Sequence, residues 1–266
     1  MDGKVHGLIG RTLAHSWSVE IHELLGCADY RLIELEPEEV GPFLVRDDLG
    51  GGNVTIPYKV DVVPFCDELS QVAREIGSVN TVVRRDDGTL LGDNTDREGM
   101  LYAARRAGLD FAGAKVLVLG SGGTSRTACS ALKHVGAREV VIISRGGEDN
   151  YGNLHRHADA EFIINTTPVG MYPKVDTAPV DLTLFPACRG VLDVIYNPRR
   201  TALLAQAEEL GIPHTDGLPM LVAQAKASEG VFFEGRVFPD DMIEDIVEVL
   251  ARRHGGQPDG GRMARG

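Results

Sequence analysis

The run Lys115-Val-Leu-Val-Leu119 constrains the fold of this chain more than any other segment. Its continuous apolar character is typical of a strand buried on both faces of a parallel sheet. The turn Gly120-Ser-Gly-Gly123 follows directly, and residues 124–135 have the pattern of a helix. A strand, a glycine turn and a helix in this order predict one unit of a doubly wound α/β sheet.

Strand and helix patterns alternate along most of the remaining chain. Strands are predicted at residues 5–9, 30–35, 53–55, 81–85, 89–92, 139–144, 162–165 and 191–194. Helices are predicted at residues 18–25, 38–45, 68–76, 97–107, 201–210, 218–228 and 240–253, with further helical material from Pro57. Asp86-Asp-Gly88 has the chemistry of a hairpin turn. Residues 146–159 are too few and too polar for a full crossover helix plus strand, which predicts a reduced sheet there.

A chain of 266 residues is long enough for two hydrophobic cores. We expect an N-terminal mixed-sheet α/β domain of residues 1–97, completed by residues 217–266. Residues 98–216 are expected to form a C-terminal Rossmann-like, doubly wound domain, with a cleft between the two. The glycine-rich tail, residues 255–266, is expected to be disordered.

The charge of the chain narrows the classes of partner. Its formal net charge is -12, with 39 acidic residues against 27 lysines and arginines, so phosphate backbones and anionic lipids are repelled. We therefore expect no nucleic acid and no membrane partner. No apolar stretch approaches the roughly 20 residues of a membrane span, and the N-terminus lacks a signal pattern, which favours a cytoplasmic protein.

Cysteine and histidine positions argue against a metal centre. Cys27, Cys66, Cys129 and Cys188 are widely spaced and are expected to be reduced and mostly buried. The one close histidine pair, His155 and His157, has no cysteine nearby. We therefore expect no metal.

The glycine loop predicts a dinucleotide site because it joins an apolar strand to a helix. Gly120 permits the tight turn, Gly122 lets a pyrophosphate approach the backbone, and the N–H groups at the helix start bind the anion. Ser125 replaces a third glycine. The alternative is an ordinary strand-to-helix turn. Arg145, at the end of the next strand, suits a 2'-phosphate and favours NADP, unless it is only a solvated loop arginine.

Three polar features indicate a small-molecule reaction. Lys59 follows Pro57 in a predicted first helical turn, where an amine can exchange protons with a substrate hydroxyl. Asp96 is a possible partner for it, although alone it could be a helix N-cap. Ser16 and Ser18 lie at a predicted helix start that favours a carboxylate, although Ser18 could be only an N-cap.

These segments together resemble the shikimate dehydrogenase family, and the resemblance covers nearly the whole chain. The runs that carry it are His15-Ser-Trp-Ser-Val19, Gly51-Gly-Asn-Val-Thr-Ile-Pro-Tyr-Lys59, Gly92-Asp-Asn-Thr-Asp96 and Gly120-Ser-Gly-Gly123. The resemblance implies NADP-dependent, reversible reduction of 3-dehydroshikimate to shikimate, in aromatic amino acid biosynthesis, with Lys59 and Asp96 as the catalytic pair. The substrate contacts it implies are Ser16, Ser18, Thr55, Asn80, Tyr196 and Gln224. The cofactor contacts it implies are Gly120, Ser121, Gly122, Gly123, Thr124, Ser144, Arg145, Thr166, Pro168 and Gly217.

Two other functions stay open on the sequence. An NAD-preferring quinate/shikimate dehydrogenase shares these motifs, and a non-catalytic sensor could keep the fold and bind cofactor or polyol without turnover. Intact Lys59 and Asp96 argue against the sensor, and Arg145 argues against a preference for NAD. For all of these functions we expect the protein to be a monomer or a homodimer.

Overall fold

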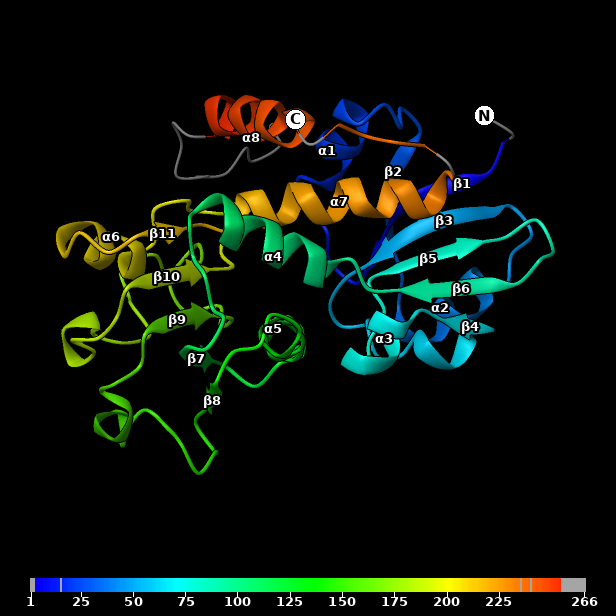
Figure 1. The fold of residues 1–266 in the computed structure, drawn as a ribbon. Coiled ribbons are helices and arrows are strands. Elements are labelled where there is room, and N and C mark those ends of the chain that lie inside the picture. Colours follow the sequence, from blue (N-terminus) through cyan, green and yellow to red (C-terminus); the bar gives the residue numbers. More distant parts are fainter. Residues whose placement is uncertain (1–2, 15, 235, 240, 255–266) are drawn as a thin grey trace. The chain divides into compact units, whose positions relative to one another are not determined.

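The computed structural model describes residues 3–14, 16–234, 236–239 and 241–254. The chain divides into two compact units, which Figure 1 shows. Unit 1 comprises residues 1–102, 122–135 and 220–239, and unit 2 comprises residues 103–121, 136–219 and 240–266. The tail at residues 255–266, which we expect to be disordered, lies outside the described residues, as do His15 and the predicted helix start at Asp240.

Unit 1 contains a six-stranded mixed sheet in the order β2-β1-β3-β5-β6-β4. Its strands are β1 (Val5–Gly10), β2 (Tyr30–Glu34), β3 (Leu49–Val54), β4 (Glu68–Leu69), β5 (Thr81–Arg84) and β6 (Leu90–Asp93). β1 pairs in parallel with β2 and β3, whereas β5 pairs antiparallel with β3 and β6. The predicted hairpin at residues 86–88 is confirmed.

The helices of unit 1 are α1 (Ser18–Leu24), α2 (Pro37–Leu44), α3 (Gln71–Ile76), α5 (Gly123–His134) and most of α7 (Leu218–Phe232). Helix α4 (Asp96–Arg106) begins in this unit. A hydrophobic core of unit 1 consists of Ile9, Val40, Leu44, Leu49, Val54, Tyr58, Val62, Ala73, Val79, Val82 and Leu90.

Two predicted helices of unit 1 are wrong in detail. The segment from Pro57 forms turns and a short 3-10 helix, Val63–Phe65, because buried Tyr58 anchors it by donating a hydrogen bond to the Leu35 carbonyl at 2.6 Å. Residues 68–76 do not form one helix. Glu68 and Leu69 pair with β6, and Ser70 starts α3 by accepting a hydrogen bond from the Ala73 N–H.

Strand β3 contains three consecutive glycines because neighbouring groups approach its backbone directly. A Cβ at Gly50 would lie 2.5 Å from the His6 ring, and one at Gly51 would lie 2.6 Å from the Phe232 ring. At Gly52 the Gly7 carbonyl oxygen would lie 2.8 Å away. Real Cβ atoms do not come this close to other atoms, so the bare strand allows both rings to pack on it.

Unit 2 contains a five-stranded parallel sheet in the order β11-β10-β9-β7-β8. Its strands are β7 (Lys115–Leu119), β8 (Glu139–Ile143), β9 (Phe162–Asn165), β10 (Gly190–Asp193) and β11 (His214–Thr215), and its helices are α6 (Ala202–Glu209) and α8 (Asp241–His254). β7 is fully buried, as its apolar run predicts. Between β8 and β9 the chain forms only the 3-10 helix Leu154–His157, which confirms the reduced crossover. The short strand β11 was not predicted.

All four cysteines are free thiols, as expected. Only Cys27 is fully buried, and the other three are partly buried. Burial raises the pKa of the Cys27 and Cys66 thiols to about 11. In the described part of the chain, no helix combines the length and the apolar content that crossing a bilayer requires.

Candidate active site

Lys59 and Asp96 meet in unit 1, although 37 residues separate them in the sequence. The Lys59 Nζ donates a hydrogen bond to the Asp96 Oδ2 at 2.5 Å. Lys59 lies in the turn segment after β3, and Asp96 is the first residue of α4. Their side chains are 24% and 12% exposed, so the pair is sheltered but reachable by a ligand. This pair could exchange a proton with a bound hydroxyl or ketone.

Asn80 connects this pair to the rest of unit 1. Its side-chain amide donates to the Asp96 Oδ1 at 2.9 Å and to the Gln224 Oε1 at 3.3 Å. Its side-chain carbonyl accepts from the Thr95 N–H at 2.8 Å and from the Thr81 hydroxyl at 2.9 Å. Three predicted site residues, Asp96, Asn80 and Gln224, are therefore joined directly, and the carboxylate is held on both oxygens.

Asn53 extends this network to Tyr30. The Asn53 Nδ2 donates to the backbone carbonyl of Asn80 at 3.4 Å and to the Thr81 hydroxyl at 3.3 Å. The Asn53 Oδ1 accepts a hydrogen bond from the Tyr30 hydroxyl at 2.8 Å. Burial, together with the charge of Glu229, raises the pKa of Tyr30 well above its usual range, so its hydroxyl remains a donor. No sequence pattern predicted a role for Tyr30, Thr81 or Thr95.

The two predicted carboxylate-binding serines lie together at the start of α1. The Ser16 hydroxyl donates to the Ser18 hydroxyl at 3.0 Å and accepts from the Ser18 N–H at 3.2 Å. Ser18 is therefore not the N-cap: it is the first helical residue, after Trp17, and no side chain caps this helix. Thr55 directly follows β3 and is partly buried. Tyr196 belongs to unit 2, where burial raises its pKa.

The glycine loop has the strand-to-helix geometry that the sequence predicts. β7 ends at Leu119, α5 begins at Gly123 with Gly122 as its N-cap, and Gly120 has a φ of 108° that favours glycine. No atom lies within 4 Å of a Cβ built on Gly122 or Gly123. Open space beside these residues and the unpaired N–H groups of a first helical turn fit a pyrophosphate. Thr124 follows in that turn, and Ser121 before it is exposed.

The chain after β8 turns sharply at Ser144. The Ser144 N–H donates to the Asp149 carbonyl at 3.2 Å, and the carboxylate of Asp149 bonds His157 at 2.9 Å. Arg145 is exposed and forms no ion pair or hydrogen bond with any side chain in the described ranges. Its guanidinium is therefore available to an anionic ligand.

The remaining predicted cofactor residues lie beyond the ends of β9 and β11. The Thr166 hydroxyl donates to the Leu119 carbonyl at 2.7 Å, at the base of the glycine loop, and Pro168 follows in the same turn. A Cβ on Gly217 would lie 2.0 Å from the Val194 carbonyl oxygen, so only glycine fits there. These turns lie at the carboxyl ends of parallel strands, where ligands bind open sheets.

Asp193, at the end of β10, makes the stability of the folded protein depend on pH. It accepts hydrogen bonds from Asn165 at 3.0 Å and from Thr201 at 2.8 Å, yet burial raises its pKa from 3.8 to about 6. The folded protein therefore binds this proton more tightly than the unfolded chain does. The resulting stabilisation is complete below about pH 4 and is lost as the pH rises through about 6.

We expect Asp193→Asn to remove this dependence. Relative to the variant, the free energy of unfolding of the unmodified chain should fall by up to about 3 kcal/mol as the pH rises from about 4 to about 6. Urea unfolding of both proteins, followed by circular dichroism at each pH, measures the difference. A difference that does not change with pH would contradict the assignment to Asp193.

A buried pair of polar side chains in unit 1 was not predicted from the sequence. The Nδ1 of His22, on α1, lies 2.5 Å from the Oε1 of Glu229, on α7, and the two side chains are 1% and 0% exposed. The His22 ring stacks on Tyr30 with centroids 3.7 Å apart. Glu229 interrupts the apolar stripe Val222, Ala225 and Phe232, and that was the one signal available.

Comparisons with known proteins show which family the chain belongs to. A family model described as the shikimate dehydrogenase substrate binding domain matches residues 8–82. A shikimate dehydrogenase (NADP(+)) of Caldicellulosiruptor bescii is 38% identical, over 93% of this chain and 96% of its own. The chain belongs to the shikimate dehydrogenase family.

Solved structures of the shikimate dehydrogenase family confirm the two-domain α/β fold. A chorismate mutase/shikimate 5-dehydrogenase fusion protein from Clostridium acetobutylicum has a TM-score of 0.89 and 34% identity, covering 95% of this chain and 99% of that chain. Shikimate 5-dehydrogenase from Thermus thermophilus, in complex with NADP(H) and shikimate, has a TM-score of 0.82 and 29% identity. It covers 92% of this chain and 99% of that chain.

Proposed function

We propose that this chain catalyses the reversible, NADP-dependent reduction of 3-dehydroshikimate to shikimate. The observation that carries the proposal is the 2.5 Å contact between Lys59 and Asp96, held by Asn80, in a member of the shikimate dehydrogenase family. An NADP-binding relative with shikimate in its solved structure supports the choice of substrate and cofactor.

Lys59 is the proposed proton carrier. A bound nicotinamide would supply the hydride chemistry of the reaction. In oxidation the amine form of Lys59 takes the hydroxyl proton, and in reduction its ammonium form returns that proton to the carbonyl oxygen. Asp96 orients the Lys59 Nζ and Asn80 fixes the carboxylate, so the proton donor is positioned before substrate arrives.

The remaining polar residues are proposed to hold the substrate. Ser16 and Ser18 would bind the carboxylate, while Thr55, Asn80 and Gln224 would bond the ring hydroxyls, with Tyr196 beside them. Buried polar groups of this kind discriminate strongly, because a ligand without the matching hydroxyl leaves them unpaired. In this division of labour, residues 1–97 with 217–266 bind the substrate and residues 98–216 bind the cofactor.

The cofactor contacts are proposed along the glycine loop and the neighbouring turns. Gly120, Ser121, Gly122, Gly123 and Thr124 would hold the pyrophosphate, because the space beside Gly122 and Gly123 is open. Arg145, with Ser144, would bind the 2'-phosphate. Thr166, Pro168 and Gly217 would line the nicotinamide half of the site.

An activity assay tests the proposal directly. The purified full chain, given shikimate and NADP, should produce NADPH, which is followed by its absorbance. A sensor of the same fold would bind shikimate or NADP without turnover, so binding without NADPH formation would contradict an enzymatic function. Quinate in place of shikimate, in a parallel assay, measures the breadth of the substrate site.

Arg145→Ala is expected to weaken NADP selectively. Loss of charge-assisted hydrogen bonds to a phosphate costs about 1.5–3 kcal/mol, which predicts a KM for NADP raised by about tenfold to a hundredfold. The KM for NAD, which lacks the 2'-phosphate, should change little.

The exposed Arg74, on α3, provides a control for the loss of one positive charge. Arg74→Ala should leave the KM for NADP and the KM for NAD near their original values. Equal effects of Arg145→Ala on NAD and NADP, or faster turnover with NAD in the unmodified chain, would contradict the assignment of the 2'-phosphate to Arg145.

A further inference from the structure

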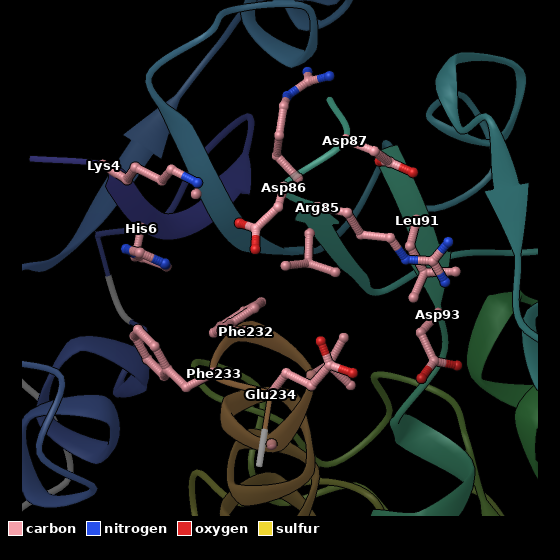
Figure 2. Close-up of a pocket in the computed structure, with 15 residues that line it drawn as sticks. Lys4, His6, Arg85, Asp86, Asp87, Leu91, Asp93, Phe232, Phe233 and Glu234 are labelled. Atoms are coloured by element: carbon pink, nitrogen blue, oxygen red, sulfur yellow. The ribbon is translucent and has the colours of Figure 1, made fainter. Parts of the chain in front are cut away.

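Unit 1 has a cavity of about 700 Å³ that the proposed reaction does not use (Figure 2). It lies between the start of β1, the hairpin turn after β5 and the C-terminal end of α7. None of the residues proposed to bind shikimate or cofactor lines it. Gly50 at one end of β3 borders the cavity, whereas Thr55 follows the other end, about 16 Å away at the usual rise per residue.

The floor of the cavity is apolar and preformed. His6, Val83 and Phe232 are buried there, and the His6 ring packs against those of Phe232 and Phe233 with centroids 5.8 and 5.1 Å apart. Because Gly50 and Gly51 lack side chains, two of these rings rest directly on β3. A volume of this size and an apolar floor are usual for a small-molecule site.

Most charges around the cavity already have partners. Arg85 pairs with Glu68 at 2.7 Å, and Asp87 accepts a hydrogen bond from the Thr89 hydroxyl at 2.6 Å. Arg84 donates to the carbonyls of Gly88 and Leu44, and Asp93 accepts from Ser70. A ligand would gain little from these groups.

Lys4, Asp86 and Glu234 differ from the other charges. Within the described part of the chain, none of these three side chains forms a hydrogen bond or an ion pair. Figure 2 shows the carboxylates of Asp86 and Glu234 pointing into the same space from opposite sides, with Phe232 and Phe233 at its lower edge. One ammonium group, from Lys4, and two carboxylates are thus available beside the aromatic rings.

We propose that this cavity binds an α-amino acid with an apolar side chain. The ammonium group of the ligand contacts Asp86, its carboxylate contacts Lys4, and its side chain lies on Phe232 and Phe233. A simple anion would meet the acidic side chains of Asp86 and Glu234, and a simple cation would meet Lys4. Only a ligand with both charges pairs with unpaired groups of both signs.

Titration of the full chain with L-phenylalanine, by calorimetry in the presence of saturating shikimate, tests the proposal. Shikimate keeps the Ser16 and Ser18 position occupied, so the titration reports a separate site. Phenethylamine, which lacks the carboxylate, and 3-phenyllactate, which lacks the ammonium, should each bind at least about fivefold more weakly. No detectable binding of phenylalanine, or equal binding of all three compounds, would overturn the proposal.

Two variants locate the site. Asp86→Asn and Lys4→Met should each weaken phenylalanine binding by about fivefold or more, while shikimate oxidation continues at its original rate. Neither residue contributes to the hydrophobic core, so both variants should fold. Asp47→Asn, which neutralises an exposed aspartate outside the cavity, is the matched control. Unchanged affinity in both cavity variants, or loss of binding on addition of shikimate, would show that phenylalanine binds elsewhere.

Discussion

Lys59→Ala should lower kcat by roughly 10²- to 10⁴-fold, the usual contribution of a positioned acid or base. The KM for shikimate should change far less, because the serines and amides proposed to hold the substrate are untouched. Without the Lys59 Nζ, the Asp96 carboxylate keeps its hydrogen bond from Asn80 but has no proton to pass to the substrate. Steady-state kinetics with shikimate and NADP separate the two constants.

Lys133→Ala is the matched control, because Lys133 is an exposed lysine on α5. Its kcat should remain near that of the unmodified chain. Near-normal turnover in Lys59→Ala would remove Lys59 from the mechanism. A raised KM with unchanged kcat would instead make Lys59 only a substrate-binding residue.

Removing one partner of the His22–Glu229 pair should destabilise unit 1 by about 3–5 kcal/mol, because the other polar group would stay buried without its hydrogen bond. His22→Ala and Glu229→Ala should therefore both unfold at much lower urea concentration. Trp17, the single tryptophan, is buried next to α1, so its fluorescence reports unfolding of this region.

The double variant His22→Phe, Glu229→Leu separates polar pairing from packing. Replacement of a buried pair by apolar side chains of similar size is often neutral, so the double variant should recover most of the stability that either alanine variant loses. Single variants that unfold at the original urea concentration would contradict a stabilising role for this pair. A double variant less stable than both single variants would also contradict it.

Patterns that repeat along the chain made most of the fold predictable. The apolar run of β7 and the turn residues of the β5–β6 hairpin each fix local structure by a short-range rule. The incorrect predictions are at positions where contacts between residues far apart in the sequence determine the local structure. Tyr58 anchors a turn segment through the Leu35 carbonyl, and pairing of Glu68 with Leu91 of β6 replaces the first turn of a predicted helix.

The site was less accessible to sequence reasoning than the fold. Resemblance to a family suggested that Lys59 and Asp96 meet, since no local pattern relates residues 37 positions apart. Tyr30 and Thr81 were missed because their role depends on which groups the sheet places beside Asn53. Conversely, Gly217 was expected to contact the cofactor, and the structure adds a steric reason for glycine there.

The glycines of β3 have a consequence for mutational surveys of this protein. They immediately precede Asn53 and the segment that leads to Lys59, the proposed proton carrier, so a scan of substitutions would find intolerant positions from residue 50 onward, close to that lysine in the sequence. For the first three positions that intolerance comes from rings and a carbonyl lying where a methyl group would be. Loss of activity there would record a collapsed strand, and a stability measurement on each variant is needed before any chemical role is inferred.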